Sequence, residues 1–238
     1  MDKSQHTDQH TSQRFDAELE ALRSSVLTMG GLVERQCRQA LEALSKGDGE
    51  LAGIVARSDR EVNSLELQIS AQCTDILALR QPAARDLRTV IAIIRLVANL
   101  ERIGDEAAKI GRKALKLADD AGRNSYCSEP QHMGEGVCSM LRGALDAFAR
   151  LDVDAAIEVI ARDKEIDREF KSLNRLLMTH MMEQPQRVKN LLRINSCARA
   201  LERVGDHAVN LCEEVIYLVE GNDVRHLSLD EVRRRHGS

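Results

Sequence analysis

Apolar side chains recur every three or four residues along most of the chain, which is the spacing of one face of an α-helix. Short breaks rich in Gly, Asn or Pro interrupt these stripes. The pattern predicts helices over residues 15–44, 50–79, 82–120, 132–150, 154–182 and 186–220. Because the connections are short, we expect consecutive helices to lie antiparallel in an all-α bundle.

The second half of the chain repeats the first. Residues 100–107 read Leu-Glu-Arg-Ile-Gly-Asp-Glu-Ala, and residues 201–208 read Leu-Glu-Arg-Val-Gly-Asp-His-Ala, an offset of 101. Upstream, segment 59–63 aligns with segment 163–167 at an offset of 104. A period this long indicates duplication of a domain rather than a short-period solenoid. We therefore predict two tandem, sequence-related three-helix bundles.

The breaks in the pattern give the domain boundaries. The opening residues are polar after Met1 and predict a disordered tail. The expected divisions are a disordered tail over 1–13, a first bundle over 14–120, a linker over 121–131, a second bundle over 132–220 and a C-terminal tail over 221–238. The tail contains three consecutive arginines, which we expect to be solvated.

Composition excludes several classes of protein. Two tyrosines, three phenylalanines and no tryptophan leave few stacking platforms for single-stranded nucleic acid, and a net charge of −4 offers no basic surface for a duplex. No uncharged apolar run is long enough to span a membrane. Six cysteines without paired spacing predict reduced thiols that fill the core of a cytoplasmic protein.

The repeated motifs carry paired carboxylates. Glu101 and Asp105 recur as Glu202 and Asp206, each pair four residues apart on one helix face, where like charges repel. A bound cation would offset that repulsion. The preceding helix of each repeat carries a matching pair, either Asp59 with Asn63 or Asp163 with Asp167.

If the two helices of each repeat are neighbours, four oxygen-bearing side chains meet across one groove, a suitable ligand set for a hard cation. The first groove would hold three acids and Asn63, and the second would hold four acids. We therefore expect the first to bind metal more weakly. The glycines within the motifs, Gly104 and Gly205, predict close approach of a neighbouring helix.

Two alternatives to a metal-binding scaffold stay open on the residues alone. Arg102 and Arg203 lie within reach of the acids, so the carboxylates could form ordinary surface ion pairs. A carboxylate-bridged metal-storage or metal-dependent redox protein is the enzyme hypothesis, but no helix carries the Glu-x-x-His pair of ferritin-like di-metal sites. We find no phosphate-binding loop or nucleophile–base set, and we expect no catalytic activity.

The chain resembles the PhoU family of bacterial phosphate-transport regulators. The likeness rests on Gln-Pro-Ala-Ala-Arg-Asp-Leu-Arg at 81–88, on Leu-Glu-Arg-Ile-Gly-Asp and Leu-Glu-Arg-Val-Gly-Asp in the two repeats, and on the ending 221–226. It implies two symmetrical bundles with iron or other divalent metal ions at the carboxylate motifs. It also implies a cytoplasmic, non-catalytic, homodimeric negative regulator that does not bind nucleic acid. Its expected partners are a sensor histidine kinase and the ATPase subunit of the phosphate ABC transporter, and only these would bring it to the membrane.

Overall fold

The computed structural model describes residues 3–119 and 126–237, with side chains from Phe15 onward. Helices make up nearly all of this part of the chain, and it contains no β-strand. In chain order the elements are α1 (Lys3–Lys46), α2 (Gly49–Arg57), α3 (Asp59–Arg80), α4 (Ala84–Ala118), α5 (Gln131–Arg150), α6 (Val153–Glu183), the short 3₁₀ helix η1 (Pro185–Arg187), α7 (Val188–Glu220) and α8 (Leu229–His236).

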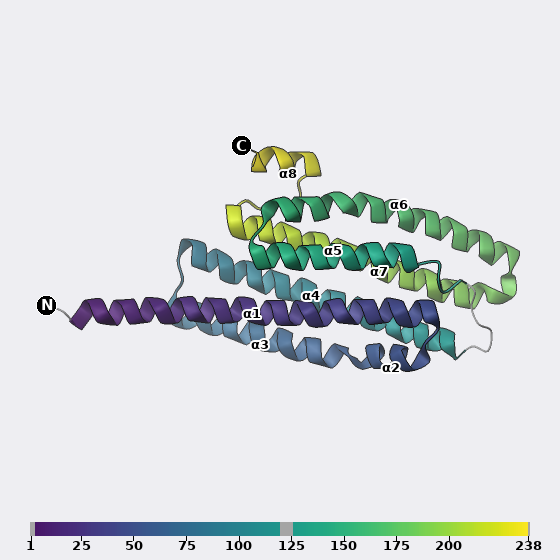
Figure 1. Ribbon diagram of the computed structural model, residues 1–238, viewed down its shortest axis with the longest axis horizontal. Coiled ribbons are helices and arrows are strands. Elements are labelled where there is room, and N and C mark those ends of the chain that lie inside the picture. The colour runs from purple at the N-terminus through teal and green to yellow at the C-terminus, as the bar shows by residue number, and fades with distance from the viewer. Residues whose placement is uncertain (1–2, 120–125, 238) are drawn as a thin grey trace.

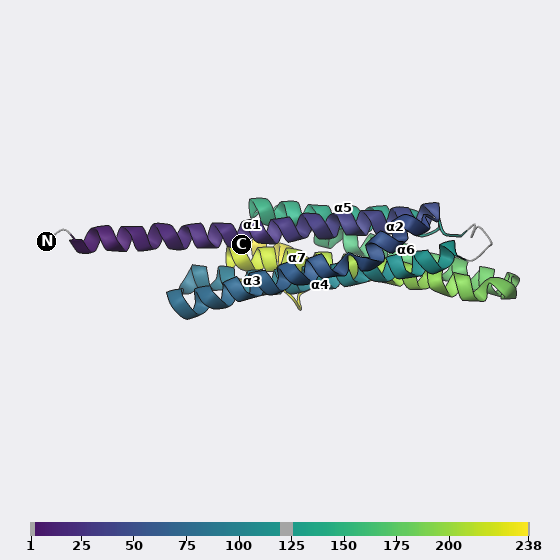
Figure 2. The same cartoon turned by 90° about the horizontal axis from the view of Figure 1, so that it is seen from below.

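The two repeats form two bundles that lie side by side in an elongated molecule (Figures 1 and 2). In the first repeat α1, α4 and the α2–α3 pair pack together, and in the second α5, α6 and α7 do so. Across the joint between the repeats, α4 packs on α7 and α1 packs on α5. The predicted all-α architecture of two three-helix units is therefore confirmed.

Apolar side chains from both repeats form one continuous core. The predicted stripes on α4 and α7 face it, and Leu100 and its equivalent Leu201 are completely buried. Helices α2 and α6, which follow the first helix of each repeat, begin with the same kind of N-cap. Asp48 accepts a hydrogen bond from Leu51 N, and Asp152 accepts one from Ala155 N. The repeat in the sequence is thus a repeat in three dimensions.

Helix α1 begins earlier than predicted. Residues 1–13 were expected to form a disordered tail, but α1 starts at Lys3 and runs without interruption into the bundle. Figure 1 shows this end extending beyond the other helices. Once the packed part of a helix exists, each further residue adds a backbone hydrogen bond without repeating the cost of nucleation. Polar composition alone therefore misplaced this boundary.

The helix predicted over 50–79 is wrong in one respect, because it is broken at Ser58. At the break, the amide of the buried Gln36 on α1 donates to the Ser58 carbonyl across 3.1 Å. In the second repeat the equivalent of Gln36 is Met140, which offers no such donor, and α6 runs unbroken. The copies therefore differ where a polar side chain replaces an apolar one.

The end of the chain is also more ordered than predicted. The expected tail over 221–238 contains α8, which packs on α6 and buries Val232. The Ser228 and Glu231 side chains form a capping box at its start. The three arginines are exposed, as expected. The linker predicted over 121–131 ends one residue early, since α5 begins at Gln131, and residues 120–125 lie outside the described ones.

A polar seam runs along the contact between α4 and α7. Asn99 Oδ1 accepts hydrogen bonds from His207 Nδ1 and Asn210 Nδ2, each at 3.0 Å. Glu106 Oε1 on α4 lies 3.4 Å from Arg203 Nη1 on α7. As residue numbers rise on one helix they fall on the other, so the two helices are antiparallel.

The six cysteines are all buried and unpaired, as the sequence predicted. Burial raises the pKa of Cys138 to about 11 and that of Cys197 to about 12, so these thiols stay protonated near neutral pH. Within the described ranges, no helix is long and apolar enough to cross a membrane.

Candidate functional site

The structure brings the four predicted groups of the first repeat together. The break at Ser58 makes Asp59 the first residue of α3, and Asn63 lies one turn further on. Glu101 and Asp105 lie on α4, which packs against α3. Asn63 Nδ2 donates to Asp59 Oδ2 at 3.4 Å. All four side chains are partly buried along this groove between α3 and α4, here the first acid groove.

The acids of the first acid groove repel one another. Burial and then the negative charge of Asp105 raise the pKa of Asp59 above its usual range. The same two causes raise the pKa of Glu101, and Asp59 adds to the effect. The acids therefore lie close enough to disfavour one another's charge, as their spacing predicted.

Two oxygen atoms in this groove have no hydrogen-bond partner. Asp59 Oδ1 and Asn63 Oδ1 are buried, and neither contacts a donor in the described part of the chain. Buried acceptors are normally paired, because losing hydration without compensation costs about 1–3 kcal/mol. Two adjacent unpaired oxygens are what a hard cation, or ordered water, would satisfy.

Sequence reasoning missed one acid of the first groove. Glu66 lies three residues after Asn63 and seven after Asp59, on the same face of α3, and its charge contributes to the raised pKa of Glu101. Its equivalent in the second repeat is Phe170, so a search for repeated acids could not find it. Glu66 adds a negative charge beside a groove in which Asn63 replaces an acid, and the weaker metal binding expected of the first groove stays a prediction.

The second acid groove, between α6 and α7, gathers Asp163, Asp167, Glu202 and Asp206. Burial, Asp206 and Asp167 together raise the pKa of Asp163 to about 6. Burial raises the pKa of Glu202 most, and the negative charges of Asp206 and then Asp167 raise it further. Asp206 is the most exposed of the four, and burial followed by Asp167 raises its pKa too. All eight predicted residues therefore lie in two matching grooves.

The basic residues beside the motifs mostly bind other partners. Arg102 Nε lies 3.5 Å from Glu101 Oε2, a pair of small energetic value because the Arg102 side chain is exposed. Lys109 and Arg203 both approach Glu106, at 2.8 and 3.4 Å, rather than the aspartates of the motifs. Among the described residues, no ion pair reaches Asp105 or the four acids of the second groove. A direct ion pair thus involves one of the acids, Glu101, whereas the nearby charge of Arg203 partly offsets the raised pKa values of Glu202 and Asp206.

The two motif glycines have different surroundings. A Cβ at Gly104 would lie 3.1 Å from Val62 Cγ1, so α4 and α3 approach closely there, as expected. A Cβ at Gly205 would lie 3.8 Å from Asp163 Oδ1, an ordinary contact distance. The packing is therefore tight at the first glycine and ordinary at the second.

The donor set in both grooves suits a hard cation, since it consists of carboxylate and amide oxygens without sulfur or imidazole. However, no three His, Cys, Asp or Glu side chains of the described part are arranged so that they could hold an ion without moving. The grooves therefore present neighbouring oxygens with raised pKa values rather than a closed coordination shell.

Fold and grooves together define an internally duplicated helical scaffold with two acidic grooves. The family model described as the PhoU domain matches residues 26–114 and 131–215, one match in each repeat. This chain belongs to the PhoU family.

Relatives match over nearly the whole chain. A Pseudomonas putida protein named "Phosphate-specific transport system accessory protein PhoU homolog" is 50% identical over 220 residues, covering 92% of this chain and 86% of its own length. The accessory protein PhoU of Escherichia coli is 42% identical over 229 residues, covering 96% of this chain and 95% of its own.

Solved structures share the fold. The crystal structure of PhoU from Pseudomonas aeruginosa superposes with a TM-score of 0.84 at 48% identity, covering 87% of this chain and all of that one. PhoU from Streptococcus pneumoniae, a phosphate transport system regulatory protein, gives a TM-score of 0.80 at 32% identity over 88% of this chain and 99% of its own.

Proposed function

We propose that this protein is a non-catalytic accessory regulator of phosphate transport that represses the phosphate-starvation response when phosphate is plentiful. It would act in the cytoplasm as a homodimeric scaffold between the ATPase subunit of the phosphate ABC transporter and a sensor histidine kinase. It would reach the membrane only through those partners.

The observation that carries this proposal is the match over nearly the full chain to proteins named for accessory roles in phosphate-specific transport. The long helical surface of the described residues suits a protein that works by contact. Transport-system association is the part that the relatives' names support directly, and the kinase link extends it.

We further propose that the two acid grooves bind divalent or iron-type metal ions. Asp59, Asn63, Glu101, Asp105 and Glu66 would hold the ion in the first groove. A bound cation would supply positive charge that lets neighbouring carboxylates stay ionised at close range. The unpaired oxygens of Asp59 and Asn63 support this assignment.

Deleting the gene and measuring a phosphate-starvation reporter in phosphate-rich medium tests the regulatory role. We expect the reporter to become active in the deletion strain and to be silenced again by the wild-type gene on a plasmid. A reporter that stays silent in the deletion strain under these conditions would overturn the proposal.

Metal content measured by mass spectrometry tests the grooves separately, on untagged protein purified without chelators. We expect Glu101→Ala/Asp105→Ala to remove metal from one groove and Glu202→Ala/Asp206→Ala from the other. Glu61→Ala is the matched control, because this exposed acid lies on α3 outside the groove. Equal metal in all four proteins, or none in any, would reject metal binding and leave the regulatory role to be judged by the reporter.

A further inference from the structure

A groove on the joint between the two repeats lies apart from both acid grooves. It runs between α1 and α5, with a volume of about 430 Å³. These helices are antiparallel, because Gly30 lies against Leu145 and the equivalent Gly134 lies against Leu41. A cavity of this size is large enough for a small metabolite, since ligand pockets typically begin near 300 Å³.

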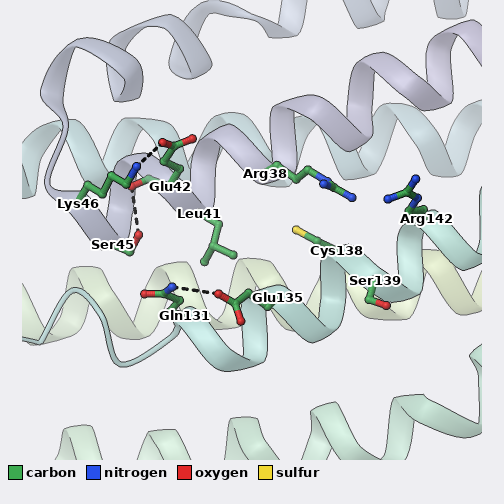
Figure 3. A pocket seen from close by; sticks show the side chains of 10 residues that line it. All are labelled: Arg38, Leu41, Glu42, Ser45, Lys46, Gln131, Glu135, Cys138, Ser139 and Arg142. Atoms are coloured by element: carbon green, nitrogen blue, oxygen red, sulfur yellow. Dashed lines mark hydrogen bonds and ion pairs between the residues drawn. The ribbon is translucent and has the colours of Figure 1, made fainter.

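Both repeats contribute an arginine to this groove. Arg38 on α1 and Arg142 on α5 are 104 residues apart, the offset that relates the first helices of the two repeats. Figure 3 shows their guanidinium groups pointing toward one another across the groove. The duplication therefore creates a pair of forked cationic donors around a local two-fold axis.

The two cations are not neutralised equally. Arg38 Nη2 lies 2.7 Å from Glu34 Oε1, an i,i+4 pair on α1. Within residues 3–119 and 126–237, no ion pair or hydrogen bond joins the Arg142 guanidinium to a carboxylate or a carbonyl group. Two guanidinium groups that converge repel each other, and a shared oxyanion would offset the repulsion by accepting parallel N–H bonds from each fork.

The remainder of the groove favours a ligand with more than a bare anion. Leu41 and the buried Cys138 give it an apolar floor. Farther along, Gln131 Nε2 donates to Glu135 Oε1 at 3.0 Å. At the same end Lys46 Nζ is paired with Glu42 Oε1 at 2.6 Å. This end of the groove therefore offers both donors and acceptors whose charges are already balanced, which suits hydroxyl groups.

We propose that this groove binds a small organic phosphate that carries hydroxyl groups. The phosphoryl oxygens lie between Arg38 and Arg142, and the hydroxyl-bearing body extends over Leu41 toward Gln131 and Glu135. The site is independent of metal in the acid grooves and goes beyond the proposed scaffold role, since it gives the joint between repeats a ligand of its own.

Isothermal titration calorimetry of the full chain tests this site with glucose 6-phosphate, inorganic phosphate and glucose as probes. We expect glucose 6-phosphate to bind, inorganic phosphate to bind more weakly and glucose not to bind. Arg142→Ala should weaken glucose 6-phosphate binding at least about tenfold, and Arg142→Lys should restore it only in part because lysine lacks the fork.

The control is Arg150→Ala, which removes an exposed arginine of the same helix outside the groove. It should bind as the wild type does, and circular dichroism should show unchanged helicity in every variant. Equal binding of both phosphates would overturn the assignment to an organic phosphate, because the hydroxyl-bearing body would then add nothing to binding. No heat with either phosphate at millimolar concentration, or equal loss in the Arg142 and Arg150 variants, would overturn the proposal.

Discussion

The close contact of α2 with α4 depends on a single missing side chain. A Cβ at Gly111 would lie 2.8 Å from the backbone nitrogen of Ala56 and 3.1 Å from the carbonyl oxygen of Ala52. Neither backbone atom can rotate away, so a methyl group there must push the helices apart. We expect Gly111→Ala to lower the free energy of unfolding by about 1–3 kcal/mol, measured by urea denaturation.

Gly205→Ala is the matched control for that experiment. Its Cβ would make only ordinary contacts, and alanine is the better helix former, so this variant should be unchanged or up to about 1 kcal/mol more stable. Equal stability of the two variants would contradict the packing argument.

At the residue scale, the sequence predicted what the repeat preserves. The paired acids of both motifs lie where their spacing placed them, because four-residue spacing fixes a shared helix face whatever the neighbours do. The sequence did not reveal the roles of Glu66 and Gly111, because the equivalent residues in the second repeat are Phe170 and Cys212 and a comparison of the repeats finds only shared residues. Their roles arise from contacts between helices, which spacing along one helix does not specify.

The last helix is held by one histidine between two acids. His236 Nε2 lies 3.1 Å from Asp154 Oδ1 on α6, and Nδ1 contacts Glu220 at the end of α7. Only the protonated imidazolium can donate hydrogen bonds to both carboxylates. The hydrogen bond to Glu220 is the main cause that raises the pKa of His236 above its usual value of about 6.5. The contacts of His236 therefore stabilise α8 fully when the pH is below the usual pKa of histidine, and this stabilisation is lost as the pH rises through the raised pKa.

Amide hydrogen exchange over residues 229–236 measures this effect. We expect protection of α8 to fall between pH 6 and pH 8.5 in the wild type, after correction for the intrinsic exchange rate. In His236→Ala, protection should be low at both pH values. His226→Ala, which removes an exposed histidine, should follow the wild type. A pH response that survives in His236→Ala would assign the effect to another group.

At the element scale, apolar periodicity predicted the number and order of the long helices, since each stripe had to face a core. It did not predict the break at Ser58, because the donor that stabilises it, Gln36, lies on another helix. It also missed α8, whose composition is strongly charged and whose only buried side chain is Val232. Elements that depend on one distant contact leave little trace in local periodicity.

We expect the two bundles to unfold together, because one core and one polar seam join them. Asn99 is the centre of the seam, and Asn99→Ala would leave His207 and Asn210 without their acceptor. Partly buried donors that lose a partner cost about 1–3 kcal/mol. We expect a single calorimetric transition whose midpoint falls by about 2–4 °C for each kcal/mol lost.

Asn222→Ala provides the comparison, since it removes an exposed amide after α7 and should leave the midpoint unchanged. Two separate transitions in the wild type would show that the bundles are independent and would contradict the joint core.

At the scale of the molecule, duplication was visible in the sequence and the pairing of the copies was not. The repeats predict two similar bundles but contain no signal for which faces meet. Glu106 is buried and Asn99 is hydrogen-bonded to Asn210, so α4 and α7 meet through polar residues. The apolar periodicity of the sequence cannot predict such a contact.

The antiparallel crossing of α4 and α7 has the geometry of an isologous dimer whose subunits have become one polypeptide. In a true dimer, each contact across the axis occurs twice. Here the bond from His207 to Asn99 has no twin, because the equivalent positions are Glu106 and Ala200. Covalent linkage thus frees each half from copying the other, and a symmetrical frame can present two unlike faces to two unlike partners.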